Sequence, residues 1–247
     1  MAERLHVVLA RAGIASRRQA ERLIREGRVS VNGKVVLRLG TQVVWGEDKI
    51  RVDKRLVRRL DPQVTIVLNK PKQVLTTSRD PRGRTTTAEL VRGVRARLFP
   101  VGRLDYHTEG LLILTSDGGL AHLLQHPRYG IPKTYRTKVK GIPGEQAIGR
   151  LRSGVSLGGK STAPAQVKKV GTTGRNAWLE ITIREGRNRQ VRRMCKAVGH
   201  PVMKLKRIRY GPVVLGDLKP GAYRQLTARE METLKRQVSK VSLSSNP

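Results

Sequence analysis

The most informative stretch of this chain runs from Gly102 to Gly118 and reads GRLDYHTEGLLILTSDG. It places a carboxylate, Asp105, two residues after the cation Arg103 and ahead of an apolar run that ends at Thr115. The rest of the chain is strongly basic, so a carboxylate here is hard to explain as a contact to a polyanion. We interpret Asp105 as a nucleophile or base that acts on a ligand captured by the basic surface. An Asp that only caps a helix or a turn is the alternative interpretation of this spacing.

The composition predicts a polyanionic partner. The chain has 247 residues, with 51 Lys and Arg against 18 Asp and Glu, so its formal net charge is +33. A protein this basic repels itself unless counter-charge is supplied. The hydrophobic fraction of 38% still allows hydrophobic cores in one or two domains. The single cysteine, Cys195, excludes an internal disulfide framework and a multi-cysteine zinc site.

No targeting or membrane segment is expected in this sequence. No apolar run reaches the roughly 18 residues that a membrane span needs. The N-terminus, MAERLHVVLARAG, lacks the apolar core and the small-residue cleavage site of a secretory signal. We therefore expect a cytoplasmic protein without a membrane partner.

Helix and turn signals follow one another closely in the N-terminal part of the chain. Apolar residues at helical spacing from Leu5 predict a first helix that Gly13 ends. Ser16 begins a capping pattern, Ser-Arg-Arg-Gln, for a second helix that runs to about Glu26. Asn32-Gly33 then predicts the tight turn of a β-hairpin. These signals together predict a small separate unit.

The second predicted helix carries arginines on the face opposite its apolar residues. A basic face is often only solvated, but the guanidinium group presents a planar fork that suits phosphate oxygens. With this net charge, we interpret the face as an RNA contact. The segment also resembles an S4 RNA-binding domain in its two helices, its Ser-Arg-Arg turn and its V-x-V-N-G hairpin. The expected RNA contacts are Arg17, Arg18, Arg22 and Arg25.

The charged segment from Val52 to Pro62 is interpreted as a linker, with a basic arm along RNA as the alternative. Beyond it, short apolar runs predict strands, and strands and helices do not alternate regularly. We therefore expect an α+β fold, with a mixed, largely antiparallel sheet in the second domain. The expected strands are 65–68, 111–115, 135–139, 178–183 and 213–215, and the expected helices are 120–125 and 190–198.

Three further motifs follow the Asp105 run in a fixed order. They are Lys133-Thr134-Tyr135, the run EGRNRQVRRM from Glu185, and the run LKRIRYG from Leu205. Together with the Asp105 run they resemble the RsuA/RluB family of rRNA pseudouridine synthases, and most closely its RluB type, which acts on large-subunit rRNA. The resemblance covers roughly residues 4 to 235. We expect an S4-like domain in 1–60, a catalytic domain in 63–240 and a disordered tail in 241–247.

The resemblance implies a role for five residues. Asp105 matches the catalytic aspartate, which attacks or assists at the target uridine. Tyr135 matches the tyrosine that packs on the target base, and Leu205 matches an apolar residue that lines the base pocket. Arg192 matches the basic residue that pairs with the aspartate. Arg103 is expected to contact the RNA or to hold the loop.

The segment from Arg187 to Arg193 contains four arginines and no acid, which favours an RNA groove over a solvated face. Arg187 and Arg189 are therefore expected to contact RNA. Arg189 stands where some relatives have His, a difference that bears on substrate choice. Cys195 falls on the apolar side of the predicted helix, which argues against a uracil C5-methyltransferase with a cysteine nucleophile.

The implied reaction turns uridine into pseudouridine, which breaks the C1′–N1 bond and forms a C1′–C5 bond. Because nothing is gained or lost, no metal and no cofactor is expected. The expected partner is ribosomal RNA (23S) or a large-subunit assembly intermediate, bound by a monomer. The alternative is a non-catalytic rRNA-binding ribosome-assembly factor. Asp105 and Tyr135 separate the two hypotheses, because a pure binder has no reason to hold a carboxylate against an anionic ligand.

Overall fold

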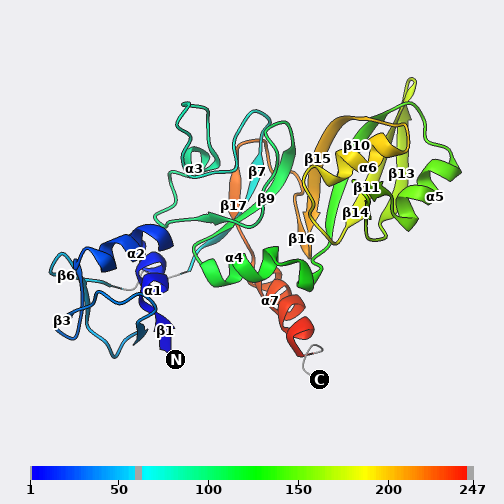
Figure 1. Ribbon diagram of the computed structural model, residues 1–247. Coiled ribbons are helices and arrows are strands. Elements are labelled where there is room, and N and C mark those ends of the chain that lie inside the picture. Colours follow the sequence, from blue (N-terminus) through cyan, green and yellow to red (C-terminus); the bar gives the residue numbers. More distant parts are fainter. Residues whose placement is uncertain (1, 59–62, 244–247) are drawn as a thin grey trace. The chain divides into compact units, whose positions relative to one another are not determined.

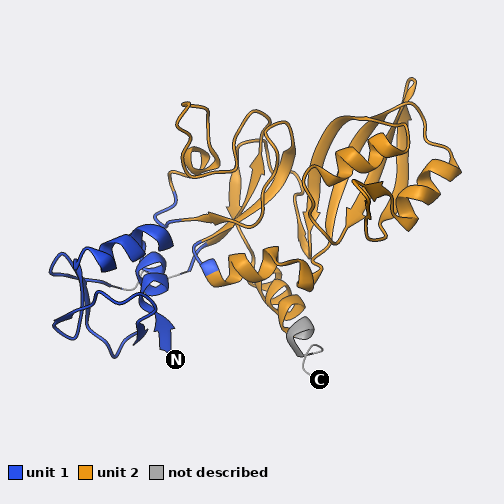
Figure 2. Ribbon diagram, viewed as in Figure 1, with its two compact units in different colours: residues 1–64, 94–97, 116–118 blue, residues 65–93, 98–115, 119–247 orange. Residues whose placement is uncertain are grey.

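The structure is a computed structural model that describes residues 2–58 and 63–243. The chain divides into two compact units, shown in separate colours in Figure 2. Unit 1 comprises residues 1–64, 94–97 and 116–118, and unit 2 comprises the remainder.

Unit 1 packs two short helices and several short strands around one apolar core, as the local signals predict. The Ser16 hydroxyl accepts a hydrogen bond from the backbone N–H of Gln19 at 3.2 Å, which confirms the predicted helix cap. Asn32 and Gly33 both have positive φ, as the predicted hairpin turn requires. The elements are β1 (Ala2–Arg4), α1 (Leu5–Arg11), α2 (Arg17–Arg25), β2 (Val29–Val31), β3 (Lys34–Val35), β4 (Gln42–Val44), β5 (Ile50–Val52) and β6 (Arg55–Leu56).

The predicted linker from Val52 is wrong at its start. Strand β6 pairs with β5 through a turn at Asp53 and Lys54, which have φ values of 48° and 64°. No glycine marks this turn, so the sequence carries no strong signal for it. Instead, Arg28 holds Asp53 by two hydrogen bonds, of 2.8 and 2.6 Å. The rest of the predicted linker, residues 59–62, lies outside the described residues.

Unit 2 is built on one nine-stranded sheet with the order β13-β14-β10-β15-β9-β7-β17. Strand β16 pairs with β15, and β8 pairs with β9. Every pairing of this sheet is antiparallel except that of β9 with β15. This confirms the expected α+β fold with a mixed, largely antiparallel sheet. The strands are β7 (Thr65–Lys70), β8 (Phe99–Pro100), β9 (Glu109–Thr115), β10 (Lys133–Lys140), β13 (Gln166–Thr173), β14 (Asn176–Ile183), β15 (Val202–Tyr210), β16 (Val213–Val214) and β17 (Tyr223–Gln225).

The helices of unit 2 cover the two ends of this sheet separately. Helices α4 and α7 share an apolar core with β7 and β9, whereas α5 and α6 share one with β10, β13, β14 and β15 (Figure 1). A small hairpin, β11 (Ser156–Leu157) with β12 (Lys160–Ser161), lies against α6. The helices are α3 (Thr87–Leu90), α4 (Gly118–Gln125), α5 (Glu145–Ser153), α6 (Gln190–Ala197) and α7 (Ala228–Leu243).

The prediction that a disordered tail starts at residue 241 is wrong at its start, because helix α7 extends past this position. The helix continues to Leu243, so residues 241–243 are helical rather than disordered. The rest of the predicted tail, residues 244–247, lies outside the described residues.

Strands β9 and β15 join the two halves of the sheet. Their parallel contact consists of two residue pairs, Lys206 with Glu109 and Arg207 with Gly110. The two halves therefore meet over a very short ladder. The loop that precedes β9 is the one that carries Asp105, so the junction of the half-sheets positions the predicted catalytic residue.

Candidate active site

The loop that carries Asp105 is anchored on both sides of that residue. Before it, the Thr76 hydroxyl donates to the Leu104 carbonyl oxygen at 2.8 Å. After it, the buried ammonium of Lys70 donates to the Thr108 carbonyl oxygen at 2.9 Å. The backbone N–H of Thr108 donates to the Asp105 carbonyl oxygen, also at 2.9 Å. These hydrogen bonds fix the backbone from which the carboxylate projects.

The Asp105 carboxylate is half-buried and has no hydrogen-bond or ion-pair partner within residues 2–58 and 63–243. The expected direct pair with Arg192 is not formed. Arg192 instead donates to the His107 carbonyl oxygen at 3.1 Å and to the Thr108 hydroxyl at 3.4 Å. Burial lowers the pKa of Arg192, Arg189 lowers it further, and the charge of Asp105 opposes both. Arg192 therefore holds the loop that carries Asp105, and the two charges interact without a direct contact.

Asp105 lines a cavity of about 670 Å³. Small-molecule sites commonly measure about 300–1,000 Å³, so this cavity is large enough for one nucleotide. Tyr135 of β10 is paired with Arg207 of β15, which places both on one face of the sheet, together with Leu205 two residues earlier. The cavity brings together six of the predicted site residues, namely Arg103, Asp105, Tyr135, Arg187, Arg189 and Leu205.

Two buried or half-buried cations that the sequence analysis did not select also line the cavity, beside the exposed Arg184. Arg207 is only 2% exposed, and its Nε donates to the Leu111 carbonyl oxygen at 2.7 Å. Lys133 donates to the Ile131 carbonyl oxygen at 3.0 Å. Burial lowers the pKa of Lys133 to about 8, and the charge of Arg207 contributes to the same shift. Both cations lie over the ring of Tyr210, at 5.2 and 5.5 Å from its centroid.

Lys70, which anchors the loop, was also missed by the sequence analysis. Its side chain is fully buried, and this burial lowers its pKa to about 8 against the attraction of Asp105 and Glu109. A signal was available, because Lys70 lies only two residues beyond the end of the predicted apolar strand 65–68. A lysine that ends a strand buried at all six positions must find carbonyl partners inside the protein.

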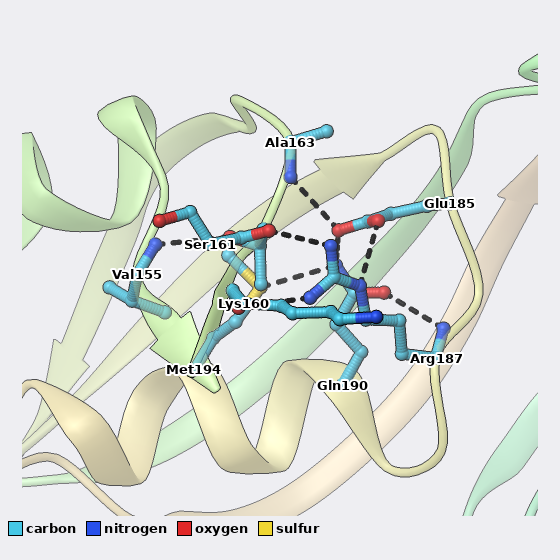
Figure 3. A network of polar contacts seen from close by, with 9 residues as sticks. Val155, Lys160, Ser161, Ala163, Glu185, Arg187, Gln190 and Met194 are labelled. Atoms are coloured by element: carbon cyan, nitrogen blue, oxygen red, sulfur yellow. Dashed lines mark hydrogen bonds and ion pairs between the residues drawn. The ribbon is translucent and has the colours of Figure 1, made fainter. Parts of the chain in front are cut away.

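Arg187 lies in a network of polar contacts within the protein (Figure 3). Its Nε donates to Glu185 at 3.1 Å, and its terminal nitrogens donate to the carbonyl oxygens of Lys160 and Ser161 at 3.0 and 2.6 Å. The Gln190 side chain accepts from the Arg187 backbone N–H at 3.0 Å and donates to Glu185. The guanidinium group therefore ties the β12 hairpin to the start of α6. This structural role accounts for most of its hydrogen-bonding capacity.

The other predicted RNA contacts are exposed. Arg189 stands at the N-cap of α6 with a left-handed φ of 49°. In unit 1, Arg22 pairs with Glu26 at 2.7 Å, an exposed pair that leaves most of the guanidinium accessible. The exposed arginines of α2 are Arg17, Arg18, Arg22 and Arg25.

Comparison with known proteins identifies the family. Residues 64–197 match the family described as RNA pseudouridylate synthase, and residues 3–50 match the S4 domain. The chain belongs to the RNA pseudouridylate synthase family. Ribosomal large subunit pseudouridine synthase B of Bacillus subtilis (strain 168) is 46% identical over 235 residues, which cover 94% of this chain and 96% of that protein.

Other relatives of this pseudouridine synthase agree. The protein of the same name from Pseudomonas aeruginosa is 42% identical and matches 96% of this chain, but only 62% of its own length. A crystal structure described as a pseudouridylate synthase superposes with a TM-score of 0.67 at 32% identity, covering 94% of this chain and 99% of that one. These matches favour the enzyme over the non-catalytic assembly factor.

The single cysteine lies in the apolar core, as the sequence predicts. Cys195 is fully buried, and burial raises the pKa of its thiol to about 12, which confirms that it packs in the core rather than acting as a nucleophile. Among the described residues, every helix is too short or too polar to cross a membrane.

Proposed function

We propose that this enzyme isomerises a uridine of large-subunit ribosomal RNA, with Asp105 as the catalytic carboxylate. The observation that carries the proposal is the half-buried Asp105 carboxylate, which lines a nucleotide-sized cavity and has no partner in the described part of the chain. The names of the two relatives support the choice of the large subunit. On this proposal the protein acts as a monomer in the bacterial cytoplasm, on 23S rRNA or on an assembling subunit.

The target base has to leave its stack to reach Asp105, which costs a few kcal/mol. Stacking on an aromatic ring returns about 1–3 kcal/mol per base, and Tyr135 is the aromatic residue placed on the same sheet face as Arg207. Leu205 adds an apolar wall. Phosphate contacts to arginine and lysine side chains provide the remaining affinity.

The reaction breaks the C1′–N1 bond, forms the C1′–C5 bond and transfers one proton from C5 to N1 overall. No oxidant, reductant or group donor is needed to balance it. Asp105 acts at the sugar, either by bonding to C1′ or by abstracting a sugar proton. When the electron pair of the broken bond stays on the uracil, the detached ring is negatively charged. The cations Arg207 and Lys133 line the cavity and stabilise this charge.

The substitution Asp105→Asn tests the proposal, because it keeps the shape of the side chain and removes its charge. We expect no pseudouridine formation and an RNA affinity equal to or slightly above that of the wild type, since one negative charge is lost. The measurement is pseudouridine mapping of large-subunit and small-subunit rRNA transcripts after incubation with each variant, beside binding of the large-subunit RNA.

The matched control is Asp217→Asn, which removes an exposed carboxylate of unit 2. We expect wild-type activity from it. Pseudouridine formation by Asp105→Asn at the control rate would refute the catalytic assignment. Modification confined to small-subunit rRNA would refute the choice of substrate and leave the catalytic assignment intact.

A further inference from the structure

The half-sheet formed by β13, β14, β10 and β15 has one face that none of the described helices covers. Strand β14 shows this most clearly, because its residues alternate strictly between buried and half-buried. The buried ones, such as Leu179 and Ile181, pack with α5 and α6, which lie on one side of these strands (Figure 1). Successive side chains of a strand point to opposite faces, so Trp178 and Glu180 lie on the other side. We call that side the open face.

The strand register places seven cations on the open face. Lys138 is directly paired with Trp178 on one side and with Lys204 on the other. Arg136 is likewise paired with Glu180 and with Lys206. None of the seven is buried. They are Arg136, Lys138, Lys140, Lys168, Lys204, Lys206 and Arg209.

Few carboxylates balance these charges. Glu180 pairs with Arg136 at 2.7 Å, and Glu109 of the neighbouring strand β9 is opposite Lys206. Residues two apart on a strand are separated by roughly 6.6 Å, and neighbouring strands by about 4.8 Å. Both spacings are shorter than the screening length of about 8 Å at physiological salt. The cations therefore repel one another as a group unless an anion covers them.

Protection of a sheet edge does not explain this pattern. Lysines on edge strands prevent unwanted strand pairing, which accounts for Lys168 on β13. Strands β10 and β15, however, are internal strands of the sheet. Like charges directly opposite each other destabilise a sheet, and Lys138 with Lys204 is such a pair on these two strands. A destabilising arrangement on internal strands points to a function that needs it.

We propose that the open face binds phosphate groups of the RNA outside the target nucleotide. It is a second RNA contact, on the opposite side of the half-sheet from the cavity residues Tyr135 and Leu205. The proposal rests on the proposed function in that the substrate is a large RNA that extends beyond the cavity. Lysines predominate on the face, and their ammonium groups act as point charges that bind phosphate without reading a base sequence. The indole of Trp178 is half-buried between the strands, with Lys138 6.0 Å from its ring.

The test is the double variant Lys138→Gln/Lys204→Gln, which removes the directly opposed pair. The probe is an unmodified large-subunit rRNA transcript, bound at salt concentrations between about 50 and 200 mM. Each phosphate contact contributes about 0.7–0.9 to the slope of log affinity against log salt, so we expect a slope shallower by about 1.4–1.8. We also expect weaker binding across this range and an unchanged rate of pseudouridine formation at saturating RNA.

The control is Lys219→Gln/Lys235→Gln, which removes the same charge from exposed positions outside the open face. The proposal is overturned if the slope of log affinity against log salt is the same for this variant as for the control. It is also overturned if the open face binds an acidic protein while the variant binds RNA as the wild type does. If the first variant does not fold, Lys140→Gln/Lys168→Gln carries the same expectation. If the wild type makes no pseudouridine at all, the proposed function fails, whereas the salt slopes still decide whether the open face binds RNA.

Discussion

Gly110 is the residue on which the junction of the two half-sheets depends most directly, and Gly110→Ala tests this. It lies at φ +108°, on β9, directly opposite Arg207 of β15. A Cβ atom at this position would overlap the Arg207 carbonyl oxygen and lie 2.7 Å from its amide nitrogen. Backbone atoms do not move aside as the end of a flexible side chain does, so the strands themselves have to separate.

The size of the effect follows from two contributions. A non-glycine residue in a sparsely populated φ region costs about 1–3 kcal/mol. Overpacking adds typically about 1–3 kcal/mol. Ordinary contact begins at 3.4 Å, so the amide nitrogen alone has to move by at least 0.7 Å, the difference between 3.4 and 2.7 Å. We expect the free energy of unfolding of unit 2 to fall by roughly 2–6 kcal/mol, which lowers Tm by roughly 5–20 °C for a domain of this size.

The assay is thermal unfolding, with Gly174→Ala as the matched control. Gly174 also has a positive φ, of +57°, but a Cβ there would meet nothing within 4 Å. The control isolates the backbone strain of an alanine in the left-handed region, about 1–2 kcal/mol. A Tm for Gly110→Ala equal to that of the control would refute the argument that close approach of β15 requires this glycine.

Four further predictions concern the cavity and its surroundings. The rate of pseudouridine formation at saturating RNA should fall as the pH rises through about 8, where Lys133 loses its charge. Lys133→Arg should remove this fall, and a fall that persists in the variant would exclude Lys133 as its cause. Because the pKa of Lys133 is lower in the folded than in the unfolded state, the free energy of unfolding should rise with pH from about 8 toward 10.5. Arg187→Lys keeps the charge but loses hydrogen-bond donors, so the free energy of unfolding should fall by about 1–3 kcal/mol in thermal unfolding, while the salt dependence of RNA binding stays unchanged. Unchanged stability with a changed salt dependence would instead indicate that Arg187 contacts RNA. Cys195 should resist alkylation by iodoacetamide at pH 8 in the folded protein, and rapid labelling would contradict its burial.

The sequence predicts unit 1 well because its signals are local. The Ser16 cap, the Gly13 helix end and the Asn32-Gly33 turn each depend on a few neighbouring residues. The turn at Asp53 and Lys54 is not predicted, because both residues adopt positive φ much less readily than glycine does. Its conformation depends on Arg28, which is 25 residues away.

In unit 2, the sequence pattern fails to predict β15, a strand that contributes Leu205 and Arg207 to the cavity. Strand β15 reads VMKLKRIRY, in which the cations obscure the alternation of apolar and polar residues. The strand forms because β10 and β9 pair with it on either side, which no local pattern records. For that reason Leu205 was assigned a role only through the family resemblance, and Arg207 was quoted within the same motif without a role. The structure places both in the wall of the cavity with Asp105 and Tyr135, whose catalytic roles remain predictions.

The same strand shows how register alone assigns different tasks to neighbouring cations. Lys206 and Arg207 are consecutive, yet Lys206 lies on the open face and Arg207 lines the cavity. A slip of one residue would exchange their faces, so that the buried guanidinium would be replaced by an ammonium. Two features oppose such a slip. The contact at Gly110 admits no Cβ, and the irregularity in the pairing of β10 with β15 lies next to Tyr135. A mutation that relaxes the register should therefore impair the cavity and the open face together, whereas substitutions on either face alone should separate catalysis from binding.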